Sequence, residues 1–125
     1  MPKPFTIADR SRSFKFAARG AWVMLQSQHN AWIHAAVTVI VAGAGLWFQL
    51  GSAEWCWIVL AIMAVWTAEA LNTAFEFLAD VASPEFHPLV ERAKDVAAGA
   101  VLISACGSAI IGLLIFAPRL VVLIK

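Results

Sequence analysis

Three long, mostly apolar stretches decide what this chain can fold into. They cover about residues 31–50, 55–82 and 92–117, and the part from 96 to 117 carries no charge. About 20 apolar residues in a helix cross the roughly 30 Å hydrocarbon core of a bilayer. The chain is 62% hydrophobic and only 14% charged, whereas about a quarter of the residues of a soluble domain are charged. The pattern therefore predicts an all-α membrane protein with three transmembrane helices.

The segment before the first span has a different pattern. From about 13 to 28, apolar and aromatic residues recur at helical spacing, while Lys15, Arg19 and Gln26 fall on other faces. This predicts an amphipathic helix on the membrane surface, with its basic residues near anionic headgroups. The alternative is a cytosolic helix that packs on the protein's own polar end. Residues 1–12 are polar and basic, and we expect them to be mobile or loosely bound to the surface.

The basic residues set the expected orientation. Five precede the first span and two lie between the second and third, while only Arg119 and Lys125 fall on the other side. The positive-inside rule then places the N-terminus and the 83–95 connection in the cytoplasm. We expect one multi-pass domain over residues 1–125, no cleaved signal peptide, Cys56 and Cys106 as unpaired apolar residues, and no nucleic-acid partner.

The second span ends in an ordered set of polar residues. Glu69, Asn72, Thr73, Glu76 and Asp80 fall within an arc of roughly 100° on a helix, so they share one face. Glu69 lies about 16 Å of helix rise before Asp80 and is expected deepest, near the membrane boundary. Burying a carboxylate inside a membrane span costs free energy, so such a residue usually has a function. Asp80, Glu85 and Glu91 are interpreted instead as solvated residues at helix ends.

These residue types suit phosphoryl transfer. Glu69 is a candidate base, with Asn72 to position it, and Glu76 is an oxygen ligand of the kind that Mg²⁺ takes together with phosphate oxygens. Lys94 offers a point charge for a phosphate. The sequence has no Walker motif or glycine-rich kinase loop. A proton- or ion-conducting membrane oligomer is the alternative, but it needs neither Glu76 nor Lys94-Asp95.

Small residues follow one face of the third span. Ala100, Ser104 and Ser108 repeat every four residues, and such a stripe lets helices approach closely in lipid. Because three helices enclose little volume, we expect the protomers to form an oligomer. The alternative is that small residues are simply common in such helices.

Three motifs resemble a known family. EALNTAFE over 69–76 followed by Asp80, SPEFHP over 83–88, and AKDVAAGAV over 93–101 closely resemble the prokaryotic diacylglycerol kinase / undecaprenol kinase family. The resemblance covers about residues 13–117. It implies a homotrimer of three-span protomers, each with a surface helix, in the bacterial inner membrane. Active sites shared between neighbours would transfer the γ-phosphoryl group of MgATP to a lipid hydroxyl.

The resemblance also implies roles by position. Glu69 would be the base on the lipid hydroxyl, Asn72 would lie beside it, and Glu76 would bind the metal. The positions implied at the nucleotide and its Mg²⁺ are Phe16, Gly20, Gln28, Glu76, Glu85, His87, Lys94 and Asp95. Those implied at the lipid are Asn30, Trp32, Glu69 and Ala98.

This chain departs from the family pattern at three positions. Gln28 stands where a second metal carboxylate is usual, and an amide is a neutral, weaker Mg²⁺ ligand. Trp32 replaces a common arginine, and Phe16 replaces a tyrosine of some members, so a catalytically weakened member is an open alternative. The residues of the 71–74 and 83–88 motifs resemble the undecaprenol kinases more than the diacylglycerol kinases, which favours undecaprenol as the lipid.

Overall fold

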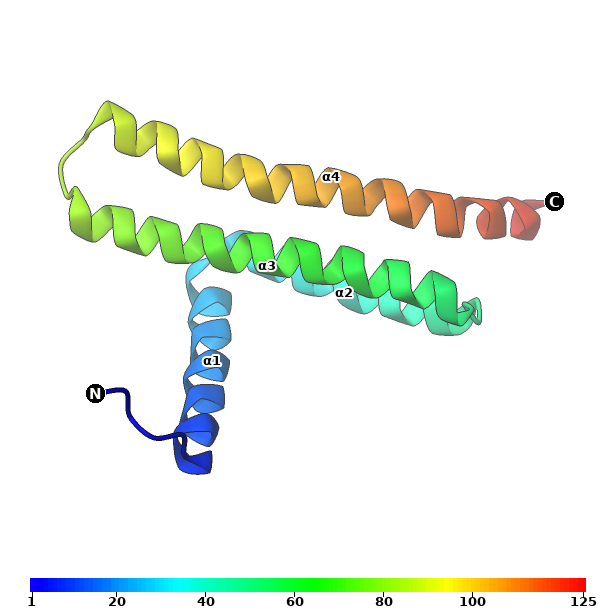
Figure 1. Cartoon of the computed structure of the whole chain (residues 1–125). Helices are drawn as coiled ribbons and strands as arrows, with labels where there is room; N and C mark the ends of the chain where they lie inside the picture. The colour runs from blue at the N-terminus through cyan, green and yellow to red at the C-terminus, as the bar shows by residue number, and fades with distance from the viewer.

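The structure is a computed structural model that describes all 125 residues, and it contains four helices and no strand. They are α1 (Ile7–Ser27), α2 (His29–Trp47), α3 (Ser52–Ala82) and α4 (Pro88–Ile124). α3 and α4 run antiparallel side by side, α2 lies against α3, and α1 projects crosswise from this bundle (Figure 1). By length and composition, α2, α3 and α4 could each cross a membrane. The all-α class and the three candidate spans are thereby confirmed.

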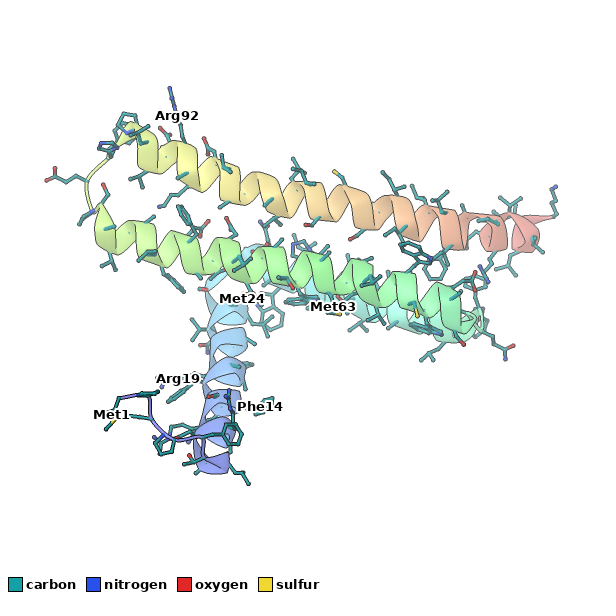
Figure 2. The ribbon with its side chains drawn as sticks, in the orientation of Figure 1. Met1, Phe14, Arg19, Met24, Met63 and Arg92 are labelled. Carbon is teal, nitrogen blue, oxygen red and sulfur yellow. The ribbon has the colours of Figure 1, made fainter.

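α1 begins earlier than the sequence pattern predicts. Its first residue is Ile7 rather than residue 13, so half of the segment expected to be mobile is helical. The reason is a cap: Thr6 Oγ1 accepts a hydrogen bond from the Asp9 backbone N–H at 3.2 Å, and it donates to the Asp9 carboxylate. Near its other end, Met24 is buried where α1 meets the bundle, while Phe14 and Arg19 lie further out (Figure 2).

The connection between α2 and α3 has the expected length but lies three residues earlier in the chain. α2 ends at Trp47 and α3 begins at Ser52, whereas the spans were expected to cover 31–50 and to start at 55. Gln49 takes a left-handed conformation with φ 53°, and the Leu50 N–H donates to the Gly45 carbonyl at 3.1 Å. This backbone bond closes the end of α2 and lets the chain reverse over a few residues.

α4 is the longest helix. It begins at Pro88, four residues before the expected start at 92, because His87 Nδ1 accepts from the Leu89 N–H at 3.2 Å and caps it. It continues through Pro118 to Ile124, seven residues beyond the expected end at 117. Arg119 donates to the Glu54 carboxylate at 2.8 Å and ties the far end of α4 to the start of α3.

Few side chains are buried inside one chain. Only 12 of 125 residues are buried, and Leu50, Ile58 and Ile115 form the one apolar cluster between the helices. Ser108 from the small-residue stripe donates to the Ala61 carbonyl at 3.0 Å, so the stripe faces α3 of the same chain at that point. Large apolar side chains cover the outside of α2, α3 and α4. A surface of this kind needs lipid or other protein chains around it.

Candidate functional site

The polar face of α3 is buried at its deep end and open at its shallow end. Glu69, Asn72 and Thr73 are 1%, 7% and 3% exposed, while Glu76 is half-buried and Asp80 is exposed. These residues form a polar strip from Glu69 to Asp80 on one face of α3. Each helical turn along the strip lies closer to the end of the helix, so exposure to solvent increases in that direction. The strip therefore leads from the interior of the bundle to the solvent-facing end of α3.

Glu69, the expected base, has a histidine beside it. The Nε2 atom of His34, on α2, lies 3.4 Å from Glu69 Oε2, and neither Glu69 carboxylate oxygen has a hydrogen-bond partner. Thr73 uses its hydroxyl on the Glu69 backbone carbonyl at 2.8 Å and so does not reach the carboxylate. The sequence analysis did not pair His34 with Glu69. A signal was present, since each of two successive spans carries one titratable residue in its apolar part.

Glu76 is held by two amides. Gln28, at the junction of α1 and α2, donates from Nε2 to Glu76 Oε2 at 2.9 Å, and Asn72 donates from Nδ2 to Oε1 at 3.3 Å. The two positions implied at the metal, Gln28 and Glu76, are thus in direct contact. Asn72 was expected to position Glu69, but its amide nitrogen bonds Glu76 instead, while its buried Oδ1 has no partner.

The oxygen atoms around Glu76 fit Mg²⁺ bound with a nucleotide. Besides the Glu76 carboxylate, the side-chain oxygens of Gln28 and Asn72 are within reach by rotation of the amides, and these are hard neutral ligands. No three His, Cys, Asp or Glu side chains gather at one point in this chain. A site with one carboxylate is typical of Mg²⁺ that brings phosphate oxygens as its other ligands.

A cleft connects the deep end of the strip to α2 and α4. It has a volume of about 250 Å³. Its lining residues are Asn30, Ile33, His34, Glu69, Asn72, Ala98, Val101, Leu102 and Ala105. Three of the four positions implied at the lipid, Asn30, Glu69 and Ala98, therefore lie around one space. The fourth, Trp32, does not line it and is 59% exposed.

Lys94 pairs with Asp80 across α3 and α4. The lysine ammonium contacts the Asp80 carboxylate, one helical turn beyond Glu76 on the same face of α3. Asp80 is exposed near the end of α3, as expected for a solvated residue at a helix end, and the ion pair with Lys94 is an additional contact. Because the pair links the two helices at the open end of the strip, it brings a cation close to the Glu76 region. The neighbouring Asp95 is exposed.

The remaining positions implied at the nucleotide lie elsewhere. Phe16 and Gly20 line a groove of about 820 Å³ between α1 and α3, together with Arg19. That groove shares no lining residue with the cleft at Glu69. Glu85 is exposed in the α3–α4 loop, and His87 caps α4. One chain thus gathers the metal positions and three of the four lipid positions, but it leaves the other nucleotide positions in three separate places.

Comparison with known proteins identifies the family. The family model described as prokaryotic diacylglycerol kinase matches residues 15–116, which is most of the chain. The chain belongs to this family.

Individual relatives agree with this membership. An undecaprenol kinase of Bacillus subtilis (strain 168) is 43% identical over 109 residues, which are 87% of this chain and 89% of that protein. A diacylglycerol kinase of Synechocystis is 34% identical over 86% of this chain, though the match covers 62% of that protein. A diacylglycerol kinase of Escherichia coli (strain K12) is 29% identical over 69% of this chain and 68% of that protein.

Proposed function

We propose that this lipid kinase transfers the γ-phosphoryl group of ATP to the hydroxyl of undecaprenol and so makes undecaprenyl phosphate. The observation that carries the proposal is the Glu69 carboxylate, which is buried and unpartnered and lines a cleft two helical turns from Glu76. The 43% identity to an undecaprenol kinase, over most of both chains, favours this lipid alcohol over diacylglycerol.

Glu69 would act as the base. Both of its carboxylate oxygens are free to accept a hydrogen bond, and burial keeps water away from them. As the lipid oxygen bonds to the γ-phosphorus, its proton passes to Glu69, and the bond between the γ-phosphorus and the β–γ bridging oxygen breaks. ADP leaves with that oxygen. Excluding water from the cleft would also limit hydrolysis of ATP.

Glu76 would hold Mg²⁺ with the side-chain oxygens of Gln28 and Asn72. When bound, the ion would neutralise negative charge on the ATP phosphates. Lys94 would contact the same phosphates, since its partner Asp80 lies one turn from Glu76. The short distance along α3 between Glu76 and Glu69 would then align the γ-phosphoryl group with the lipid hydroxyl.

The membrane would end near the junction of α1 and α2. α3 has 31 residues, which at 1.5 Å per residue is about 46 Å and longer than the roughly 30 Å hydrocarbon core. The crosswise position of α1 supports a helix that lies on the membrane surface (Figure 1). The end of α3 beyond it would stand in the cytoplasm with the N-terminus, in a bacterial inner membrane.

The active unit would be a homotrimer with shared sites. A single chain buries few residues, and its groove with Phe16 and Gly20 is separate from the cleft at Glu69. A neighbouring protomer could supply what one chain leaves apart. Cross-linking in native membranes should give a trimer as the largest species, and a monomer alone would contradict the assembly.

The test is a lipid competition with the purified full-length protein. Undecaprenol and diacylglycerol are presented in mixed micelles with radiolabelled ATP and Mg²⁺, and the labelled lipids are separated. We expect undecaprenyl phosphate as the main product. Phosphatidic acid as the main product would overturn the choice of lipid, and no lipid product with either alcohol would overturn the function. Proton flux into liposomes without ATP would favour the conducting oligomer.

A further inference from the structure

His34 lies beside the proposed base, and the mechanism above gives it no role. Four buried side-chain polar atoms in the chain lack a hydrogen-bond partner: His34 Nε2, both Glu69 carboxylate oxygens and Asn72 Oδ1. All four belong to residues that line the same cleft. Because buried polar atoms are nearly always partnered, a cluster of orphans marks a place where a ligand completes the bonding. His34 is the only one of these residues that comes from α2.

His34 lies where α2 is joined to α3, and its imidazole packs against a side chain of α3. Thr38, one turn along α2, donates to the His34 carbonyl at 2.7 Å and accepts from the Trp66 indole N–H at 3.0 Å. The His34 ring also packs edge-on against Trp66, with ring centroids 6.4 Å apart. The two Thr38 bonds tie α2 to α3 without touching the imidazole, whose Nε2 lies 3.4 Å from Glu69 Oε2. Packing against a neighbouring side chain is one way in which proteins hold a functional group in a defined position.

In the structure no other side chain of this chain donates to the Glu69 carboxylate. Lys94 is paired with Asp80, and Arg119 is paired with Glu54 at the opposite end of α3. The amide nitrogen of Asn72 is directed to Glu76. A buried carboxylate without a donor is strongly disfavoured, and no hydrogen bond then selects among the rotamers of its three side-chain torsions.

We propose that His34 is a positioning residue for phosphoryl transfer. Its Nε2–H would donate to Glu69 Oε2, so that Oε1 faces the lipid hydroxyl in the cleft. The present separation of 3.4 Å is a few tenths of an ångström longer than a hydrogen bond, and entry of the lipid headgroup would close it. This inference rests on the lipid kinase function proposed above and names a residue that it requires.

The test compares three substitutions in the full-length enzyme in mixed micelles. His34→Gln places an amide N–H at about the reach of Nε2, His34→Asn places it at the reach of Nδ1, and His34→Leu removes the donor. We expect kcat to fall by about tenfold or more in the Leu and Asn variants, the loss typical when an orienting partner is removed. His34→Gln should keep kcat within about threefold of the native enzyme, and KM for ATP should stay constant in all three.

Two readouts separate positioning from packing. Thr38→Val removes the bond to Trp66 but leaves Nε2, so it should lower Tm and leave kcat nearly unchanged. In a Glu69→Gln background, His34→Leu should cause no further loss, because both residues act through one group.

Three outcomes would overturn the role of His34 while the native enzyme is active. They are equal kcat in the Gln and Asn variants, a native kcat in the Leu variant, or a further loss in the double variant. If the Leu variant fails to assemble, the Gln and Asn pair alone decides. An inactive native enzyme would instead overturn the proposed function.

Discussion

Gln28 donates a hydrogen bond from its side-chain amide to the Glu76 carboxylate, with 2.9 Å between Nε2 and Oε2. The contact joins the start of α2 to the open end of α3. A carboxylate at position 28, as the family pattern has it, would instead repel Glu76 until a cation lay between them. The amide therefore stabilises the metal-free site, and it would offer Mg²⁺ one negative charge fewer than a carboxylate at this position.

Gln28→Glu should keep or raise kinase activity and lower the Mg²⁺ concentration needed for half-maximal rate. The added carboxylate is a stronger ligand for a hard cation than the amide it replaces. In the absence of metal, the same variant should have a lower Tm than the native protein, since two carboxylates then face each other. The measurements are Mg²⁺ titrations of rate and of Tm, with EDTA-treated protein as the starting point.

Gln26→Glu is the matched control for that experiment. Gln26 is exposed on α1 and does not line the cleft at Glu69, so the same change of charge there should leave both titrations as they are. An unchanged Mg²⁺ titration in Gln28→Glu would mean that position 28 does not touch the ion.

Glu69→Gln should abolish lipid phosphorylation, with a loss of about 10²- to 10⁴-fold, the range for removal of a general base. The amide keeps the size of the side chain but cannot accept the proton. Nucleotide affinity should stay nearly constant, because Glu69 lies two turns from Glu76. Turnover with labelled ATP and binding of ATP to the purified variant are the two measurements.

Glu91→Gln serves as the control for loss of one carboxylate, since Glu91 is exposed in the first turn of α4. It should retain the native rate. Near-normal turnover in Glu69→Gln would show that another group is the base.

The length of the apolar runs and the spacing of the polar residues were enough to predict the helices and the polar face of α3. Apolar length gives the spans, and the offsets from Glu69 to Asp80 follow from 3.6 residues per turn. The ends of the helices depend on single caps. Thr6 extends α1 to Ile7, and His87 starts α4 at Pro88, and neither cap is part of a periodic pattern.

Contacts between helices could not be predicted in the same way. The pairing of His34 with Glu69 and of Lys94 with Asp80 depends on how each helix is rotated about its axis, which apolar runs on all faces do not fix. The nucleotide positions are a further case. In one chain Phe16 and Glu85 lie apart from Glu76, and in the homotrimer proposed above another protomer would contribute them, an arrangement that residue spacing in one sequence does not encode.

Gln49→Gly should raise the stability of the bundle. Gln49 has a φ of 53° at the end of α2, a left-handed conformation that disfavours a side chain. Glycine adopts it without that penalty, and we expect a gain of about 1 kcal/mol. Thermal unfolding of the purified protein in detergent measures the change, and Gln49→Ala, which keeps a Cβ atom, should show no such gain. Equal Tm values for the Gly and Ala variants would contradict the explanation.

Gly45→Ala should destabilise the α2–α3 hairpin. A Cβ atom at this position would lie 2.6 Å from Trp55 Cη2 and 2.8 Å from Cζ2, and a rigid indole ring cannot yield as a flexible chain end would. Overpacking of this kind costs about 1–3 kcal/mol. Gly43→Ala is the matched control on the same helix, where the added Cβ meets nothing within 4 Å. Because alanine is the better helix former, that control should hold or raise Tm. A Tm loss of the same size in both variants would show that the approach of Trp55 to Gly45 is not what requires glycine there.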